Sequence, residues 1–91
     1  MKVDVKAVRR WKKLSELVKI SITSISESQN MCQDNLEVFM NDVCWEVTYH
    51  IDELQLPDDS FDVITMVHNW VKTYFDDYIT NEYYRIIREQ C

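Results

Sequence analysis

The chain contains no glycine and only one proline among its 91 residues. Tight β-hairpins need residues with positive φ, which glycine supplies most readily, so the sequence disfavours connections of that kind. Amphipathic helices need no such turns. An apolar content of 46% supplies enough material for one compact core. The sequence therefore predicts an all-α fold, with a single helical domain over residues 1–91.

Charge is segregated along the chain. The first 19 residues hold seven basic side chains against two acidic ones, a net +5, and residues 20–91 hold 14 acids against three bases, a net −11. Such an asymmetry indicates a charged partner, or one half of the molecule folding against the other. The sequence shows no apolar run of membrane-spanning length and no signal-peptide pattern. We therefore expect a cytoplasmic protein that does not enter the membrane.

The first predicted helix covers about residues 4–23 and has a basic back. At 100° per residue its apolar side chains fall on one stripe, opposite Arg9, Lys12 and Lys13. Residues 19–26 alternate apolar and polar side chains and are rich in β-branched types, so a strand is the competing interpretation for this stretch. We expect the helix.

A polar connection leads to a second helix, predicted over about residues 31–54 with Asn30 and Gln33 as a capping box. Trp45 and Tyr49 lie away from its main apolar stripe, among acidic residues. Two interpretations stay open. Either this helix is packed on most sides in the middle of the fold, or it displays both aromatic residues within an acidic field, where they would form an oligomer contact.

Pro57 is expected to end the second helix near Leu54, because proline lacks a backbone donor and restricts the residue before it. Asp59 or Ser60 can then cap a third helix. Asp62 would lie close to the unpaired amides of its first turn, where the helix dipole favours negative charge. These acids thus have a structural reason to be present.

The third helix is predicted from a broad apolar stripe that runs from Val63 to Tyr78. Thr80 can cap a short last helix with the sequence "NEYYRIIREQ". The predicted architecture is a small bundle of three longer helices plus a short C-terminal helix, with the acidic helical region at about residues 31–90.

Catalytic and metal-binding patterns are missing from the sequence. A chain without glycine has no phosphate-binding loop, dinucleotide fingerprint or nucleophile elbow. His50 and His68 fall at the edges of apolar stripes and are interpreted as boundary residues. Cys32, Cys44 and Cys91 match no common zinc spacing, and their odd number argues against a disulfide framework. We expect a protein that is not an enzyme, with reduced thiols and without a metal or cofactor.

The acidic side chains remain as the candidate site. Their simplest interpretation is a solvated surface that keeps a small bundle soluble. However, phosphates in one DNA strand recur about every 3.4 Å along the axis. Carboxylates one or two helical turns apart, about 5.4 to 11 Å, can lie at similar positions. A protein with such a surface could occupy the basic channel of a nucleic-acid-binding enzyme and inhibit it competitively.

Three segments of the chain, "DNLEVFMNDVCWEVTYHIDEL", "LPDDSFDVITMVHNWVKTYFDDYI" and "EYYRII", resemble the central and C-terminal part of the Ocr-type phage anti-restriction proteins, which are acidic, largely helical DNA mimics. The resemblance covers about residues 34–87. It implies a dimer that blocks Type I restriction enzymes in the host cell by occupying their DNA groove. The phosphate surrogates that it implies are Asp34, Glu37, Asp42, Asp52, Asp58, Asp59, Asp62, Asp76 and Asp77. The basic first helix and the lack of a densely acidic tail distinguish this chain from that family.

The basic segment "KAVRRWKKLSELVK" allows several interpretations. Its apolar side can pack in the bundle while its charges lie beside the domain's own acids. Alternatively, Arg9, Lys12 and Lys13 can contact nucleic acid or an acidic protein, or the apolar side can lie in a membrane interface. The net −11 on the rest of the domain would repel phosphates, so a protein partner is favoured over nucleic acid.

These observations predict an acidic interaction protein of phage or mobile-element type. It would inhibit a basic nucleic-acid-binding host protein, such as a restriction or defence nuclease, by DNA mimicry. The alternatives are a nucleic-acid-binding regulator that acts through the basic first helix, and an oligomeric adaptor that buries Trp45 and Tyr49 in a homodimer.

Overall fold

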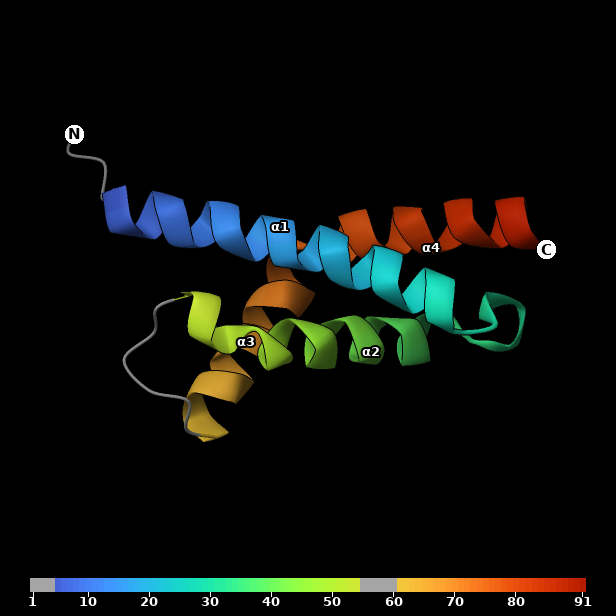
Figure 1. Cartoon of the computed structure of the whole chain (residues 1–91). Helices are drawn as coiled ribbons and strands as arrows, with labels where there is room; N and C mark the ends of the chain where they lie inside the picture. Colours follow the sequence, from blue (N-terminus) through green and yellow to red (C-terminus); the bar gives the residue numbers. More distant parts are fainter. Residues whose placement is uncertain (1–4, 55–60) are drawn as a thin grey trace.

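The computed structural model describes residues 5–54 and 61–91. Within these ranges the chain is all-α and has no strands (Figure 1). Its four α-helices and two 3-10 helices are α1 (Val5–Ser28), η1 (Met31–Gln33), α2 (Leu36–Tyr49), η2 (Ile51–Leu54), α3 (Phe61–Tyr74) and α4 (Asp76–Gln90). The predicted fold class is confirmed, whereas several helix boundaries differ from the prediction.

The other three α-helices, α1, α3 and α4, all contact α2. In Figure 1, α1 and α4 lie on one side of α2, and α3 runs across the other helices. All four contribute to one core. Its fully buried side chains include Leu14, Val18, Met31, Phe39, Val43, Val47, Val67, Val71 and Ile79.

The first helix extends five residues beyond its predicted end at residue 23. Ile22 and Ile25, which are three residues apart and so share one face of a helix, are both buried in the core. The hydroxyls of Thr23, Ser26 and Ser28 donate to backbone carbonyls one turn back, at 2.8 to 3.2 Å. The strand-like alternation of residues 19–26 is therefore accommodated within α1.

The prediction of one continuous helix over residues 31–54 is wrong, because this stretch is divided into η1, α2 and η2. Asn35, not Asn30, is the N-cap of α2, and its side chain accepts a hydrogen bond from the Val38 amide at 2.8 Å. Asn30 accepts from the Cys32 amide at 3.2 Å and caps η1. Each asparagine satisfies the amides that follow it and so begins its own element.

The prediction of a short C-terminal helix is also wrong. The third helix ends at Tyr74, and α4 has 15 residues. Tyr78 therefore belongs to α4, not to the third helix, and Thr80 lies inside α4 instead of capping it.

Phe75 causes this difference. Its backbone, with φ −117° and ψ 10°, is not helical, and it separates α3 from α4. Its ring is buried and stacks on the indole of Trp11, with a centroid distance of 5.1 Å. This contact with α1 fixes the position of the break. Asp76 and Asp77 then lie in a first helical turn, where the helix dipole favours their charge.

A disulfide joins Cys32 of η1 to Cys91, which directly follows α4. Their Cα atoms are 5.9 Å apart across a sequence separation of 59 residues. The expectation of reduced thiols is thus wrong for this pair, because folding brings together two cysteines whose spacing gives no signal. Cys44 is a free thiol buried in the core.

The predicted positions Pro57, Asp58, Asp59 and Ser60 lie outside the described residues. In the remainder of the chain, no helix combines the length and the apolar character that crossing a membrane requires.

Candidate functional site

Two of the predicted acids, Asp34 and Asp42, come together beside the end of α1. In the orientation that satisfies its amide, Gln29 donates from Nε2 to Asp34 Oδ2 at 2.8 Å and to Asp42 Oδ2 at 3.2 Å. Two oxygens that share one donor in this way are at most about 6 Å apart. The two carboxylates are therefore no farther apart than about one helical turn, about 5.4 Å, allows for phosphate surrogates.

The other described acids of the predicted set occupy the first turns of helices. Glu37 begins α2, Asp52 begins η2, Asp62 begins α3, and Asp76 and Asp77 begin α4. All five are exposed. A carboxylate at such a position stabilises its helix by about 0.3 to 1 kcal/mol. Each therefore has a local structural role in addition to its contribution to the surface charge.

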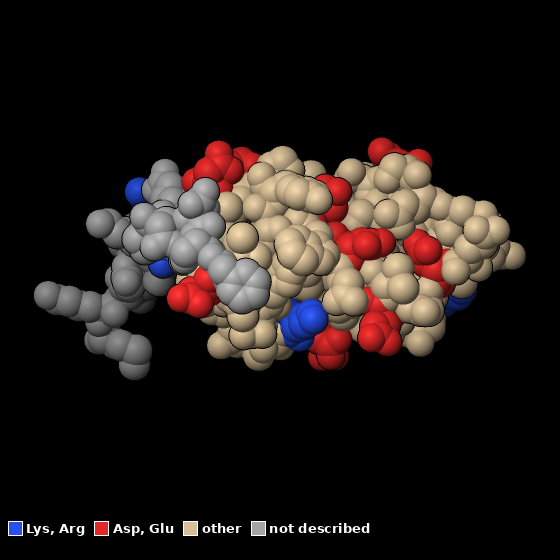
Figure 2. Space-filling view, turned by 90° about the horizontal axis from the view of Figure 1, so that it is seen from below, with Lys and Arg blue, Asp and Glu red and all other residues tan. Residues whose placement is uncertain are grey.

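We call the described acids of the predicted set the acidic face: Asp34, Glu37, Asp42, Asp52, Asp62, Asp76 and Asp77. The face has no ion pair with a lysine or arginine whose side chain lies within residues 8–54 and 62–91. Lys13 of α1 contacts other acids, Glu16 at 3.9 Å and Glu53 at 3.2 Å. Figure 2 shows one side of the bundle, on which acidic groups are spread over the surface and basic groups are few. The basic helix therefore does not neutralise the acidic face in the described structure.

The basic residues of α1 differ in their surroundings. Arg9 and Lys12 are exposed and have no acidic partner in the described part of the chain. Lys13 is paired, and Arg10 donates from Nε to the Leu54 carbonyl at 3.3 Å. Only Lys13 thus fits the interpretation that these charges lie beside the domain's own acids.

Trp45 and Tyr49 are displayed on the outer side of α2. They are 52% and 72% exposed, respectively, although α2 packs centrally against three other helices. The edge of Trp45 meets the His68 ring, with centroids 4.8 Å apart. The helix α2 is therefore central and still presents these two aromatic residues, whereas the oligomer contact stays a prediction.

The two histidines have different environments. His50 is exposed, with Nδ1 at 3.1 Å from Glu53 Oε2. His68 is partly buried, and its Nε2 has no hydrogen-bond partner among the residues that the structure describes. Burial lowers the pKa of the His68 imidazole below its usual range, and the ammonium of Lys72 lowers it further. His68 thus favours the neutral form in the folded protein.

This environment predicts a loss of stability in mild acid. Because the pKa of His68 is lower in the folded state, its contribution is fully present above the unfolded pKa of about 6.5 and is lost as pH falls through that value toward the folded pKa. The free energy of unfolding should therefore decline less between about pH 7.5 and 5.5 in His68→Gln than in the parent. Urea denaturation at several pH values measures this decline. His50→Gln is the control, and a decline as steep in His68→Gln as in His50→Gln would contradict the assignment.

The described geometry gives little support to a metal site or to a reactive thiol. Among the described residues, no three His, Cys, Asp or Glu side chains are grouped to hold a metal ion. Burial raises the pKa of the Cys44 thiol, and Lys72 only partly opposes this. A buried thiol with a raised pKa is a poor nucleophile.

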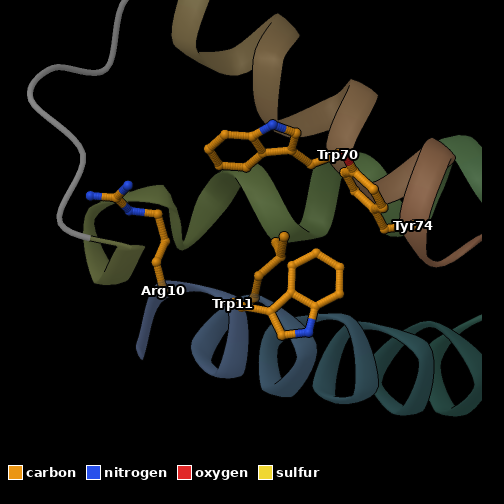
Figure 3. Close-up of a pocket in the computed structure, with 5 residues that line it drawn as sticks. Arg10, Trp11, Trp70 and Tyr74 are labelled. Carbon is orange, nitrogen blue, oxygen red and sulfur yellow. The ribbon is translucent and has the colours of Figure 1, made fainter. Parts of the chain in front are cut away.

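A pocket of about 240 Å³ lies between α1 and α3, and the sequence analysis did not predict it (Figure 3). It is lined by Arg10, Trp11, Leu14, Trp70 and Tyr74. In the sequence, Trp11, Trp70 and Tyr74 fall on the apolar stripes of the first and third predicted helices. Periodicity gave no signal of the pocket, because a half-exposed aromatic residue fits the same stripe as a buried one.

Together these features describe a small all-α protein with an acidic face and an aromatic pocket beside a basic helix. Comparison of the chain with protein-family models, curated proteins and solved structures finds no match. The resemblance to the Ocr-type proteins thus rests on the quoted segments alone, and function has to be argued from the site.

Proposed function

We propose that this protein is an interaction protein of phage or mobile-element type that presents its acidic face to a basic nucleic-acid-binding protein of the host. By occupying the nucleic-acid site of a restriction or defence nuclease, it would inhibit that enzyme without catalysing a reaction. The observation that supports this most directly is that the acidic face has no lysine or arginine partner among the described residues.

The positions of the acids suit this role. Helix first turns and the shared Gln29 contact attach the carboxylates to regular backbone, so little ordering is needed on binding. Charges farther apart than about 8 Å are largely screened at physiological salt, so close pairs such as Asp34 and Asp42 act together most strongly. A basic channel would be attracted by this field, as it is by the phosphates of DNA.

The proposal predicts that removal of charge from the acidic face weakens inhibition by about tenfold or more, because steering by surface charge changes association rates by factors of about 10 to 1,000. The test variant is Asp42→Asn/Asp62→Asn/Asp76→Asn. The amide replacements retain the shape of the side chains while removing three charges. The measurement is the concentration that half-inhibits cleavage of unmodified plasmid DNA by a Type I restriction enzyme, with circular dichroism to check helicity.

A matched control removes the same charge elsewhere. In Glu16→Gln/Glu27→Gln/Glu89→Gln all three replaced residues are exposed and lie outside the acidic face. This control should inhibit like the parent. If the first variant also inhibits like the parent, the phosphate-surrogate assignment is wrong. If the parent retards duplex DNA in a gel, the regulator is favoured, and a dimer in light scattering with neither activity favours an adaptor that uses Trp45 and Tyr49.

A further inference from the structure

The aromatic pocket is built from two helices that are distant in sequence. Trp11 projects from α1, and Trp70 and Tyr74 project from α3, where they are one helical turn apart. Figure 3 shows both indoles directed into the space between the helices, with Tyr74 beside Trp11. Leu14, which is buried, completes the apolar wall.

Ring packing holds Trp11 in place and leaves it partly exposed. Its indole stacks on Phe75, with 23° between the ring planes, and meets the ring of Tyr74 at 78° with centroids 5.3 Å apart. The stack fixes the plane of the indole and covers one of its faces. Trp11 is nevertheless 47% exposed and Tyr74 61% exposed. Trp11 is therefore held in place by its ring contacts and still exposes part of its indole, to which a planar group can pack without prior ordering.

The size of the pocket limits what it can hold. Its volume of about 240 Å³ is smaller than the 300 to 1,000 Å³ that is usual for sites of drug-sized ligands. One ring system fits such a space better than a whole cofactor. With three aromatic side chains in its walls, the pocket favours a flat ring.

The charges beside the pocket favour a ring that carries a negative group. Arg10 lines the pocket and uses Nε to bind the Leu54 carbonyl, while its remaining guanidinium donors have no carboxylate partner among the described residues. Arg9 and Lys12 are exposed on the opposite side of α1, so Arg10 is the basic residue that lines the pocket. A phosphate is such a negative group, and a nucleotide combines a planar base with a phosphate.

We propose that this pocket binds one unpaired base of a single-stranded nucleic acid, with a neighbouring phosphate on Arg10. Single-strand-binding surfaces combine aromatic stacking platforms with basic side chains that follow the backbone. Bases within a duplex are stacked and cannot enter, so duplex DNA is excluded. This site is independent of the proposed inhibition.

The intrinsic fluorescence of Trp11 and Trp70 tests the proposal. In a Trp45→Phe background these are the only two tryptophans, since the chain has three. We expect saturable quenching by an oligothymidylate of about eight nucleotides. An abasic strand of the same length and a duplex of the same length should not quench. These two controls separate binding through an unpaired base from attraction by phosphate charge alone.

Single substitutions then locate the binding site. Tyr74→Ala and Arg10→Gln should each weaken binding by about fivefold or more, in line with the contribution of one stacked base. Tyr49→Ala and Lys19→Gln are the matched controls, because they remove an exposed tyrosine and an exposed base outside the pocket. Both controls should bind like the background protein.

Three results would overturn the proposal. One is the absence of quenching by the oligothymidylate, and another is equal affinity in Tyr74→Ala and Tyr49→Ala. The third is quenching by an Asp-Trp-Asp peptide but not by the oligothymidylate, which would assign the pocket to a protein side chain instead. Since the acidic-face variant of the cleavage assay leaves the pocket residues unchanged, failure of either proposal can be recognised separately.

Discussion

Replacement of Phe39 by alanine is expected to lower the free energy of unfolding by about 3 to 5 kcal/mol, the usual cost of removing a large buried aromatic side chain. Phe39 is fully buried in α2 and packs against Tyr83 of α4, with ring centroids 5.6 Å apart. Small domains are stable by only about 5 to 15 kcal/mol, so this loss is a large part of the total. Denaturation in urea, followed by circular dichroism, measures it.

The same change should disturb the acidic face. The hydroxyl of Tyr83 donates to the Asp34 carbonyl at 2.8 Å, so the ring that packs on Phe39 also holds one of the proposed phosphate surrogates. Val38→Ala is the control, because Val38 is the preceding residue of α2 and is 42% exposed. It should change the stability by no more than about 0.5 kcal/mol. If Phe39→Ala costs no more than Val38→Ala, Phe39 is not part of the core.

The second large effect is expected from the disulfide. Reduction of the bond between Cys32 and Cys91 should destabilise the protein by about 2 to 4 kcal/mol, because the bond restricts a long loop in the unfolded chain. For a domain of this size, such a change lowers the melting temperature by about 10 °C or more. Thermal unfolding with and without dithiothreitol measures the difference.

A double variant separates loss of the bond from other effects of the reductant. Cys32→Ser/Cys91→Ser should melt near the temperature of the reduced parent and should not respond to dithiothreitol, since its remaining thiol, Cys44, is unpaired. Thiol titration of the unfolded parent should detect one free thiol before reduction. Detection of three would show that the bond is absent, and an unchanged melting temperature on reduction would contradict its stabilising role.

The fold class could be predicted because its signals are local. The absence of glycine and the helical spacing of Val63, Val67 and Val71 indicated helices, and all three valines are buried. The boundary at Phe75 could not be predicted in the same way. The apolar periodicity continues through Tyr78 without a capping residue, and the break depends on the contact of Phe75 with Trp11 in another helix.

The candidate site could be predicted only as a set of residues. The acids are visible in the sequence, but the proximity of Asp34 and Asp42 depends on Gln29, which comes from the other side of η1. The pocket is less predictable still, because it requires the packing of Trp11 against α3. Relations of this kind are tertiary, and neither periodicity nor residue spacing encodes them.

The disulfide also divides the molecule in a way that affects how it can come apart. It closes the chain from Cys32 to Cys91 into a covalent ring that contains α2, α3 and α4, and it leaves α1 outside. The first helix can therefore detach, or exchange with its counterpart in another molecule, without rupture of any covalent bond. The basic first helix is thus the part of the protein that can be released, whereas the acidic remainder stays closed by the disulfide.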